Sequence, residues 1–328
     1  MTYGDDVPAF TYTFNEDDLA DGDVIQVALG LDIAAGYKTD AGNVKAGEYG
    51  DVITAAATVY DGEGNAVTGN YEITYEFGDL TVGLRSITVT AKDQEMTYGG
   101  DMPGLDGQYT FDENALVEGD TLDVTLAYQI EDSDKSSSGN VIAGLHPGMV
   151  VEESHSLTNG ENYDYNFNAA SLNVLKKDAT VSFNAEDKDY DGTTDATRDG
   201  DFVIDGVVGG DDVRAFDTDL TFAFVAPNVL RDEDGNVLDR TVTADGELLT
   251  VGKDVGNYNI AFINTTEAKI NPLELTVTAI SQSMTYGDEN PDLAGQYTVE
   301  GLLDIDTLDV TLDYDYAHTP KSHAGRST

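Results

Sequence analysis

The sequence predicts an all-β chain, built as a tandem array of small domains of β-sandwich or β-grasp-like form that together make an elongated rod. Runs of about five to eight residues rich in Val, Thr, Tyr and Phe, separated by Gly, Asn and Asp, are typical of strands and turns. Helical periodicity of useful length is missing. At most a short helical turn, capped by Asn or Asp, is expected at 15–23 and 112–120. The third observation is that one word returns along the chain at the spacing of a small domain.

That word is MTYG, and it divides the chain into segments. It begins at Met1, Met96 and Met284, so about 95 residues separate the first two copies and about 188 separate the last two. The second interval is about twice the first, which indicates an intervening segment of similar length without the word. We therefore predict four segments: the first (1–84), the second (85–176), the third (177–272) and the fourth (273–328).

Each segment should contain similar strands in the same order. An alternating strand precedes the MTYG word, as in SITVTA (86–91) and LELTVTA (273–279). A TYTF or QYTF word, an acidic stretch and another alternating strand follow, and a pair of strands headed by Asn-Tyr closes the segment. The strands after the acidic stretch are expected at 22–29, 119–126 and 305–312, and the closing pairs at 69–82, 161–174 and 256–270.

The two ends of the chain depart from this scheme. The first segment lacks the opening strand and the fourth lacks the closing pair, so we expect the sequence to be a fragment of a longer protein. Between neighbouring segments, the closing strand runs within a few residues of the next opening strand. Short joints of this kind predict a semi-rigid array.

The charge of the chain limits its partners. With 63 acidic against 16 basic residues, the formal net charge is -47. Coulomb repulsion excludes nucleic acid and anionic membrane surfaces as partners and favours divalent cations or cationic partners. The chain has no cysteine, so neither disulfides nor thiolate metal sites can form. No apolar run approaches the roughly 18 to 20 residues that span a bilayer, so direct membrane insertion is not expected.

Two acidic stretches are candidate Ca²⁺ sites. In DKDYDG the alternate carboxylates and the glycine match the first half of an EF-hand loop, but Arg198 stands where the bidentate Glu should be. A looser Ca²⁺ site and a plain turn stay open as alternatives. In RDEDGNVLDR a hairpin turn is favoured over a metal site, because such turns use the same residues for their backbone angles. The candidate ligands are Asp187, Asp189 and Asp191 in the first stretch and Asp232, Asp234, Asn236 and Asp239 in the second.

The repeated word itself is interpreted as a structural corner. A Tyr at a strand end, a Gly that can adopt a positive φ and an Asp or Pro for a turn are ordinary corner residues. A fold needs its corner in every copy, whereas an active site seldom needs three copies. The residues are Tyr3, Gly4 and Asp5, Tyr98 and Gly99, Tyr286, Gly287 and Asp288, and, in the DYDG word of the third segment, Tyr190, Asp191 and Gly192.

Enzymatic chemistry is not indicated. The histidines, His146, His155, His318 and His323, lack metal-site spacing, and no serine lies in a G-x-S-x-G elbow. Acidic pairs are too abundant to single out any one of them. The sequence therefore predicts no catalytic residue and no cofactor other than Ca²⁺.

Three of the segments resemble a known domain family. The T-Y-G-D-x-x-P entry, the G-D-x-L-x-V strand and the N-Y-x-I-x-Y closing pair resemble MBG domains (YGX type) of large bacterial surface proteins. The third segment, with DYDGTTDA, GVVGGDDV, FVAPNV and VGNYNI, is similar to the YDG domain that accompanies them. The resemblance implies an MBG-type first segment without its first strand, an MBG-type second, a YDG-type third and a truncated MBG-type fourth, and no known catalytic residues.

The function expected from this resemblance is mechanical. It implies a stalk or filament segment of an exported, adhesin-like or filamentous-haemagglutinin-like bacterial protein with a role in cell adhesion or biofilm, located at the cell surface and facing a surface or matrix ligand. One alternative is a glycan-binding or ligand-binding β module, which exposed rows of aromatic side chains would favour. Another is head-to-tail self-association, in which residues 273–279 of one chain fill the place of the missing strand in another. The acidity fits either a high-salt source or a stalk stiffened by Ca²⁺.

Overall fold

The computed structural model describes residues 1–285 and 287–314 and confirms the all-β prediction. Its described helical elements are turns of 3-10 helix, each three residues long, and none is long and apolar enough to cross a membrane. The turns predicted at 15–23 and 112–120 form and are capped by Asn15 and Asp112. The seven turns are η1 (Glu16–Asp18), η2 (Ala35–Tyr37), η3 (Thr68–Asn70), η4 (Glu113–Ala115), η5 (Asp132–Asp134), η6 (Gly160–Asn162) and η7 (Val255–Asn257).

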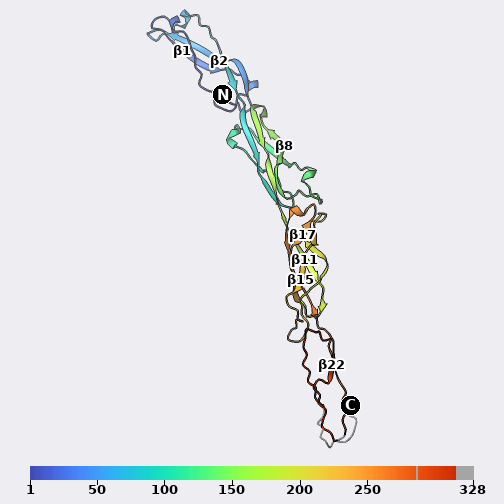
Figure 1. Cartoon of the computed structure of the whole chain (residues 1–328). Helices are drawn as coiled ribbons and strands as arrows, with labels where there is room; N and C mark the ends of the chain where they lie inside the picture. Colours follow the sequence, from blue (N-terminus) through green and yellow to red (C-terminus); the bar gives the residue numbers. More distant parts are fainter. Residues whose placement is uncertain (286, 315–328) are drawn as a thin grey trace. The chain divides into compact units, whose positions relative to one another are not determined.

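The chain divides into two compact units, Met1–Lys176 and Lys177–Thr328. In each unit most strand pairs are antiparallel and two are parallel (Figure 1). The finer division into four domains stays a prediction. Tyr286, His318 and His323 lie outside the described residues.

Unit 1 begins with a three-stranded antiparallel sheet of order β1-β2-β3. The strand β2 is the long central one, and it bends where its register with β3 shifts between Tyr49 and Ile53. Its bounds and those of its neighbours are β1 (Val24–Leu31), β2 (Gly47–Tyr60) and β3 (Gly78–Val82). Of the predicted closing pair at 69–82 only β3 forms, and no strand of the described residues pairs with 71–77.

The second segment forms two sheets that pack face to face. One has the order β6-β4-β9, with β4 (Arg85–Ala91) between β6 (Tyr109–Thr110) and β9 (Tyr163–Asn168). Alternation explains the packing, since the Ile and Val side chains of β4 are buried and its Thr side chains face solvent. The other sheet has the order β5-β10-β8-β7, with β5 (Gln94–Thr97), β10 (Ala170–Leu175), β8 (Gly144–Leu157) and β7 (Leu122–Tyr128).

Side chains from both sheets meet in one hydrophobic core. Val89 of β4 and Val150 of β8 are both fully buried within it. Two layers of strands with one core between them are what a chain of alternating strands forms when each sheet has one apolar face. The other buried members of this core are Ala91, Val124, Leu126 and Ala170.

Unit 2 repeats the arrangement in its third segment. A sheet of order β13-β11-β18 and one of order β15-β16-β19 share a core around Phe183, Phe224 and Val242. The strands are β11 (Lys177–Ala185), β13 (Arg198–Asp205), β15 (Thr221–Phe224), β16 (Arg240–Asp245), β18 (Tyr258–Phe262) and β19 (Thr265–Ala268). Two short pairs complete it: β12 (Lys188–Asp189) with β20 (Ile270–Asn271), and β14 (Arg214–Asp217) with β17 (Leu248–Val251).

The described part of the fourth segment contains one hairpin. β21 (Thr276–Ala279) pairs antiparallel with β22 (Tyr297–Glu300), and every residue of β21 is exposed. The strand predicted at 305–312 does not form, so this prediction is wrong. The matching strand of the second segment, β7, pairs with β8, and no strand follows β22 in the described residues to play that part.

Candidate functional site

A tyrosine–aspartate clasp recurs in the first three segments. In each, the tyrosine that follows Asn in the closing word accepts a hydrogen bond from the backbone N–H of a four-residue turn, and its hydroxyl donates to the aspartate at the end of that turn. The N–H contacts measure 3.0, 2.9 and 2.9 Å. The copies are Tyr71 with Ala20 and Asp23, Tyr163 with Val117 and Asp120, and Tyr258 with Val208 and Asp211.

Local sequence explains both halves of the clasp. The turns η3, η6 and η7 end directly before the three tyrosines and aim each ring across the sheet. The acidic turns close when the aspartate N–H donates to the carbonyl oxygen three residues earlier. A glycine with positive φ at the third position of these three turns, Gly22, Gly119 or Gly210, permits this closure.

In unit 1 the first Tyr of the chain joins the clasp of the next segment. The Tyr3 hydroxyl donates to Asp120 Oδ2 over 2.9 Å, while Tyr163 donates to the same oxygen over 2.7 Å. Asn159 donates to the other carboxylate oxygen, Oδ1. Asp120 is buried, so these three donors replace the water that a carboxylate would otherwise need.

Burial keeps the Tyr3 hydroxyl protonated at ordinary pH. Its side chain has no solvent exposure, and its ring meets the Tyr163 ring edge-on at 5.4 Å between centroids. Burial, with the hydrogen bond to Asp120 as a smaller cause, raises the pKa of Tyr3 to about 12. Burial likewise raises the pKa of Tyr163. Both tyrosines are therefore neutral donors at ordinary pH and are buried structural groups.

Gly4 has two reasons to be glycine. Its φ is +80°, which a side chain disfavours, and a Cβ built on it would lie 2.4 Å from Cγ2 of Val117. The close approach lets the corner of the first segment pack onto the turn of the second. The structure thus agrees with the interpretation of the MTYG word as a structural corner, because Gly4 combines a positive φ with a tight contact to Val117.

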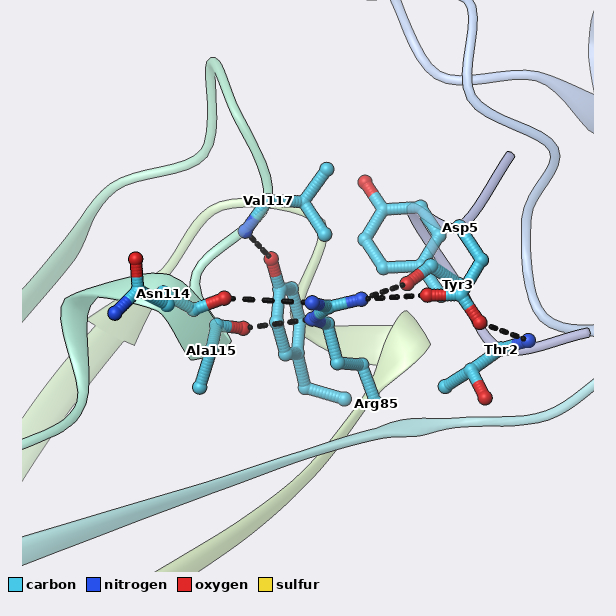
Figure 2. A network of polar contacts seen from close by, with 8 residues as sticks. Thr2, Tyr3, Asp5, Arg85, Asn114, Ala115 and Val117 are labelled. Carbon is cyan, nitrogen blue, oxygen red and sulfur yellow. Dashed lines mark hydrogen bonds and ion pairs between the residues drawn. The ribbon is translucent and has the colours of Figure 1, made fainter.

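Arg85 connects the corner to the same turn (Figure 2). Its guanidinium lies between the backbone of the first-segment corner and the η4 turn of the second segment. All three of its nitrogens donate, which holds the planar group in one orientation. The acceptors are the carbonyl oxygens of Tyr3 (3.0 Å), Ala115 (3.1 Å) and Asn114 (3.3 Å) and the carboxylate of Asp5 (3.1 Å).

Asp5 completes the corner. Its second carboxylate oxygen accepts the backbone N–H of Thr2 over 3.0 Å. That bond and the Arg85 guanidinium lower the pKa of Asp5. The carboxylate is therefore charged at neutral pH and fixes both the turn and the arginine (Figure 2).

One hydrophobic core spans the joint. It takes side chains from the first segment and from the second, and Asn162 at the same joint is buried, with its Oδ1 accepting the backbone N–H of Ala46 over 2.9 Å. A linker-like joint would have no common core. The buried members are Tyr3, Ile33, Val44, Leu80 and Val82 from the first segment and Ile87, Val117 and Tyr163 from the second.

In unit 2 a tyrosine of the third segment donates to an aspartate of the fourth, as Tyr3 donates to Asp120 in unit 1. Tyr190, of the DYDG word, donates to Asp306 Oδ1 over 3.0 Å, and Asp306 ends a turn of the same kind. Gly192 has a φ of +75°, and a Cβ there would lie 1.8 Å from Cδ1 of Ile305. The third-segment word thus takes the same place as MTYG does in unit 1.

The remaining corner residues are placed as follows. Tyr98 is buried and its hydroxyl lies 3.3 Å from Ser138 Oγ, while Gly99 has a φ of +72°. Gly287 has a φ of +95°, and the Asp288 N–H donates to the carbonyl oxygen of Thr285. Each position again shows corner geometry.

The first candidate Ca²⁺ loop already contains a cationic group. The Lys188 ammonium donates to Asp191 Oδ1 over 2.8 Å and to oxygens of Thr193 and Asp195 at 2.9–3.0 Å. Hydrogen bonds from Lys188 and from the Thr193 N–H lower the pKa of Asp191 to about 2. Oxygen atoms of this loop thus surround the Lys188 ammonium, whereas the sequence suggested that they would surround a Ca²⁺ ion.

The other candidate ligands are not gathered around one point. Asp187 Oδ1 accepts the backbone N–H of Lys269, and Asp189 is an exposed residue of β12. Asp232 accepts three bonds, from both the N–H and the side-chain amide of Asn236 and from the N–H of Asp234.

These contacts belong to a hairpin turn, and the sequence YDGEGN forms the same turn with Asp61 and Asn65. Asp239 lies 3.8 Å from Lys269 Nζ. Within the described residues no cluster of three or more His, Asp or Glu side chains is placed to hold a metal. Calcium binding at either loop stays a hypothesis.

Sequence reasoning missed the acceptor side of the joint. Asp120, Asn159 and Arg85 were not singled out, because single charged residues carry little information in so acidic a chain. One signal was available. An aspartate stands three residues after an aliphatic residue at 20–23, 117–120, 208–211 and 303–306, close to the start of a strand or of an expected strand.

Comparisons with known proteins bear on the last part of the chain. No curated protein and no solved structure matches the sequence. The similarity of the third segment to YDG domains stays a prediction. Residues 275–327 match the model of the MBG domain (YGX type), so the fourth segment is of the MBG domain type.

Proposed function

We propose that the chain is a structural repeat segment, part of a stalk or filament, of an extracellular adhesin-like or matrix protein at a bacterial cell surface. The observation that supports this most is the joint of unit 1, in which Tyr3 of one segment is buried against Asp120 of the next. Tyr190 and Asp306 form the corresponding contact in unit 2. Because a tyrosine-to-aspartate contact occurs at both joints, we take its role to be the connection of neighbouring segments.

The physics of the joint favours a mechanical role. Bending at the first joint would separate a common core and leave the buried Asp120 carboxylate without the Tyr3 donor, which costs free energy. The net charge of -47 also opposes collapse of the segments onto one another. Stiff joints and self-repulsion together suit a spacer that presents another domain away from a surface. The proposal includes no enzymatic activity and no membrane insertion.

Small-angle X-ray scattering of the full chain tests the stalk. We expect a pair-distance distribution with a long tail, typical of a rod, and an unchanged profile when salt is raised to screen the charges. The variant Tyr3→Ala, which empties the joint, should broaden the distribution, while Tyr12→Ala, at an exposed tyrosine of the same segment, should not. A compact, globular profile of the unmodified chain would contradict the proposal.

A ligand-binding module is the second candidate. Exposed aromatic side chains line the first segment as two stacked pairs, Tyr12 with Phe14 and Tyr75 with Phe77. Rows of this kind can stack on sugar rings. Most other large aromatic side chains noted above are buried at joints and cores, which favours the stalk.

A further inference from the structure

In the second segment, the strands that open and close it run side by side in the same direction. β4 pairs in parallel with β9 over residues 85–90 and 163–168. β5 pairs in parallel with β10 over residues 94–97 and 172–175. The partners are 78 residues apart in both pairs (163 minus 85 and 172 minus 94), so the two ladders share one register. The opening run, β4 and β5, therefore lies along the closing run, β9 and β10, from one end to the other.

Side chains join the two runs at the same separation. Asp93, directly before β5, accepts the backbone N–H of Ser171 with its Oδ1 over 2.8 Å. The side-chain amide of Asn173 donates to Glu95 Oε2 over 2.9 Å. Asp93 thus holds the runs together at the point where the first ladder ends and the second begins.

The third segment repeats this arrangement. Its opening run, β11 and β12, pairs in parallel with β18 and with β20. Asp187, directly before β12, accepts the backbone N–H of Lys269 over 2.7 Å and so takes the place of Asp93. The corner tyrosine extends the second ladder, because the Tyr190 N–H donates to the carbonyl oxygen of Asn271 over 2.9 Å. A feature present in two segments of different sequence belongs to the design of the fold.

The direction of these strands decides how a segment responds to a pull on its ends. The chain enters the second segment at the start of β4 and leaves it at the end of β10, and these points lie at opposite ends of the paired runs. Tension therefore draws the runs lengthwise past each other and strains the evenly spaced hydrogen bonds of both ladders together. In a hairpin pulled at its open end the bonds break one after another, so each bears the load alone.

Sheet order and burial add to this resistance. β9 is the edge strand of the order β6-β4-β9 and β5 is the edge strand of the order β5-β10-β8-β7, so the sheet neighbour of each is its partner in the other run. The inner face of the runs is buried, with Ile87 and Val89 on β4 and Leu172 and Val174 on β10. Sliding one run along the other would move these side chains out of the core, which costs further free energy.

We propose that the second and third segments each bear tension along the chain through their paired runs, which form a shear clamp, with Asp93 and Asp187 connecting the two ladders. In the sequence a single residue, Lys176, separates β10 from β11, so a load that leaves the first clamp enters the second through the backbone. The clamp lies within a segment, whereas the stalk proposal concerns the joints between segments. Scattering tests the stalk and pulling tests the clamp, so either proposal can fail alone.

Single-molecule pulling on the full chain, held at its two ends, tests the clamp. The second segment should unfold in one step, at a force several-fold above the force that peels a hairpin. Residues 85–175, at roughly 3.3–3.6 Å each, should give a step on the order of 300 Å. Gradual extension of this segment at low force would overturn the proposal.

An engineered disulfide identifies the step. Thr88 and Asn166 are register partners with exposed side chains, and the chain has no cysteine of its own. In the oxidised double variant Thr88→Cys, Asn166→Cys the residues between the two positions cannot extend, so one step should shorten to a small remainder and regain its length after reduction. If no step shortens, the second segment offers no resistance of its own and the proposal is wrong.

The direction of pulling is the matched control. Asp123 and Ser156 are exposed partners near the open end of the hairpin formed by β7 and β8. Handles attached in the double variant Asp123→Cys, Ser156→Cys load this hairpin by peeling, and the force should be several-fold lower than when the same variant is pulled at its ends. The folded state is the same in both experiments, so the difference reports the geometry of loading. Equal forces in the two directions would contradict the clamp.

Asp93→Ala tests the aspartate that connects the ladders. Forced unfolding is governed by the unfolding rate, and loss of the bond to Ser171 should raise that rate at a fixed force by about three- to tenfold. Asp123→Ala, at an exposed aspartate outside the runs, should change the rate by less than about twofold. Equal rates in the two variants would show that Asp93 bears no load and would overturn its place in the clamp.

Discussion

The Tyr3 hydroxyl illustrates what a single polar atom does at the joint of unit 1. Without it, the Asp120 carboxylate would keep Tyr163 and Asn159 as donors but lose the one donor that comes from the first segment. Hydrogen bonds to a charged group are stronger than those between neutral groups. The hydroxyl therefore contributes to the connection between segments as well as to the stability of each.

Removing this hydroxyl gives the first prediction. Tyr3→Phe keeps the ring in the common core and should lower the free energy of unfolding of unit 1 by about 1.5–3 kcal/mol. Urea unfolding followed by tyrosine fluorescence measures the change. The control is Tyr12→Phe, at an exposed tyrosine, which should change the free energy by less than about 0.5 kcal/mol. Equal effects of the two substitutions would mean that the hydrogen bond to Asp120 contributes nothing to stability.

Alkaline pH should weaken the same joint. The pKa of Tyr3 is raised from 10 to about 12 in the folded chain, so its contribution to stability is fully present below pH 10 and is lost as the pH rises through about 12. We expect the unfolding free energy to fall over this range, and to fall less steeply in Tyr3→Phe. Absorbance of tyrosinate, recorded with urea unfolding at each pH, measures both. A Tyr3 that titrates near pH 10 would contradict the burial of its hydroxyl.

Substitutions at Gly4 and Gly22 distinguish the cost of backbone strain from the cost of a steric clash. Both have positive φ, but only at Gly4 would a Cβ clash, with Val117, whereas nothing lies within 4 Å at Gly22. Gly22→Ala should cost about 1–2 kcal/mol for backbone strain. Gly4→Ala should cost a further 1–3 kcal/mol or so for overpacking. Thermal unfolding of the two variants measures the difference in destabilisation. Equal destabilisation would mean that the joint accommodates the added methyl group at Gly4 without a cost in free energy.

At the scale of the elements, alternation predicted most strands well. Strands were expected at 86–91 and 119–126, and β4 (Arg85–Ala91) and β7 (Leu122–Tyr128) form there. The errors, at 71–77 and 305–312, have one cause. A strand is stable only when its backbone groups find partners, and in both places the neighbouring strand is missing from the described chain.

The candidate site was predicted only in part. The corner residues could be found because their word repeats, but Asp120 and Arg85 could not be assigned to Tyr3, which lies 117 and 82 residues away from them. Such contacts follow from the packing of whole segments. The acidic loops show the converse, because a pattern of carboxylates typical of a metal loop surrounds the Lys188 ammonium.

A core substitution tests whether the two compact units unfold separately. Phe183 of β11 is almost fully buried in the core of unit 2, and Phe183→Ala should cost that unit about 3–5 kcal/mol. Hydrogen exchange measured by mass spectrometry should then rise in the third segment and stay unchanged in residues 1–176. Val89→Ala in β4 is the matched variant of unit 1 and should have the converse effect. A rise across both units in either variant would show that they unfold as one.

At the scale of the whole molecule, the main feature is the large excess of negative charge. The excess of 63 acidic over 16 basic residues leaves most carboxylates without a cationic partner. The ion pairs of the described residues mostly involve exposed side chains, and exposed pairs contribute little to stability. The folded chain therefore carries repulsion that its short joints and cores must overcome, and that dissolved ions can reduce.

Salt should therefore stabilise the chain, and the kind of ion shows how. Screening weakens repulsion between surface charges over roughly 10 Å at 0.1 M ionic strength, so the thermal unfolding midpoint should rise with NaCl. At equal ionic strength Ca²⁺ and Mg²⁺ should raise it alike, because Lys188 already fills the first acidic loop and Asn236 satisfies Asp232 in the second. Calorimetry in the three salts measures this. A rise specific to Ca²⁺ that disappears in the double variant Asp189→Asn, Asp234→Asn would instead establish calcium as a ligand of these loops and make the acidity part of the stiffening of the stalk.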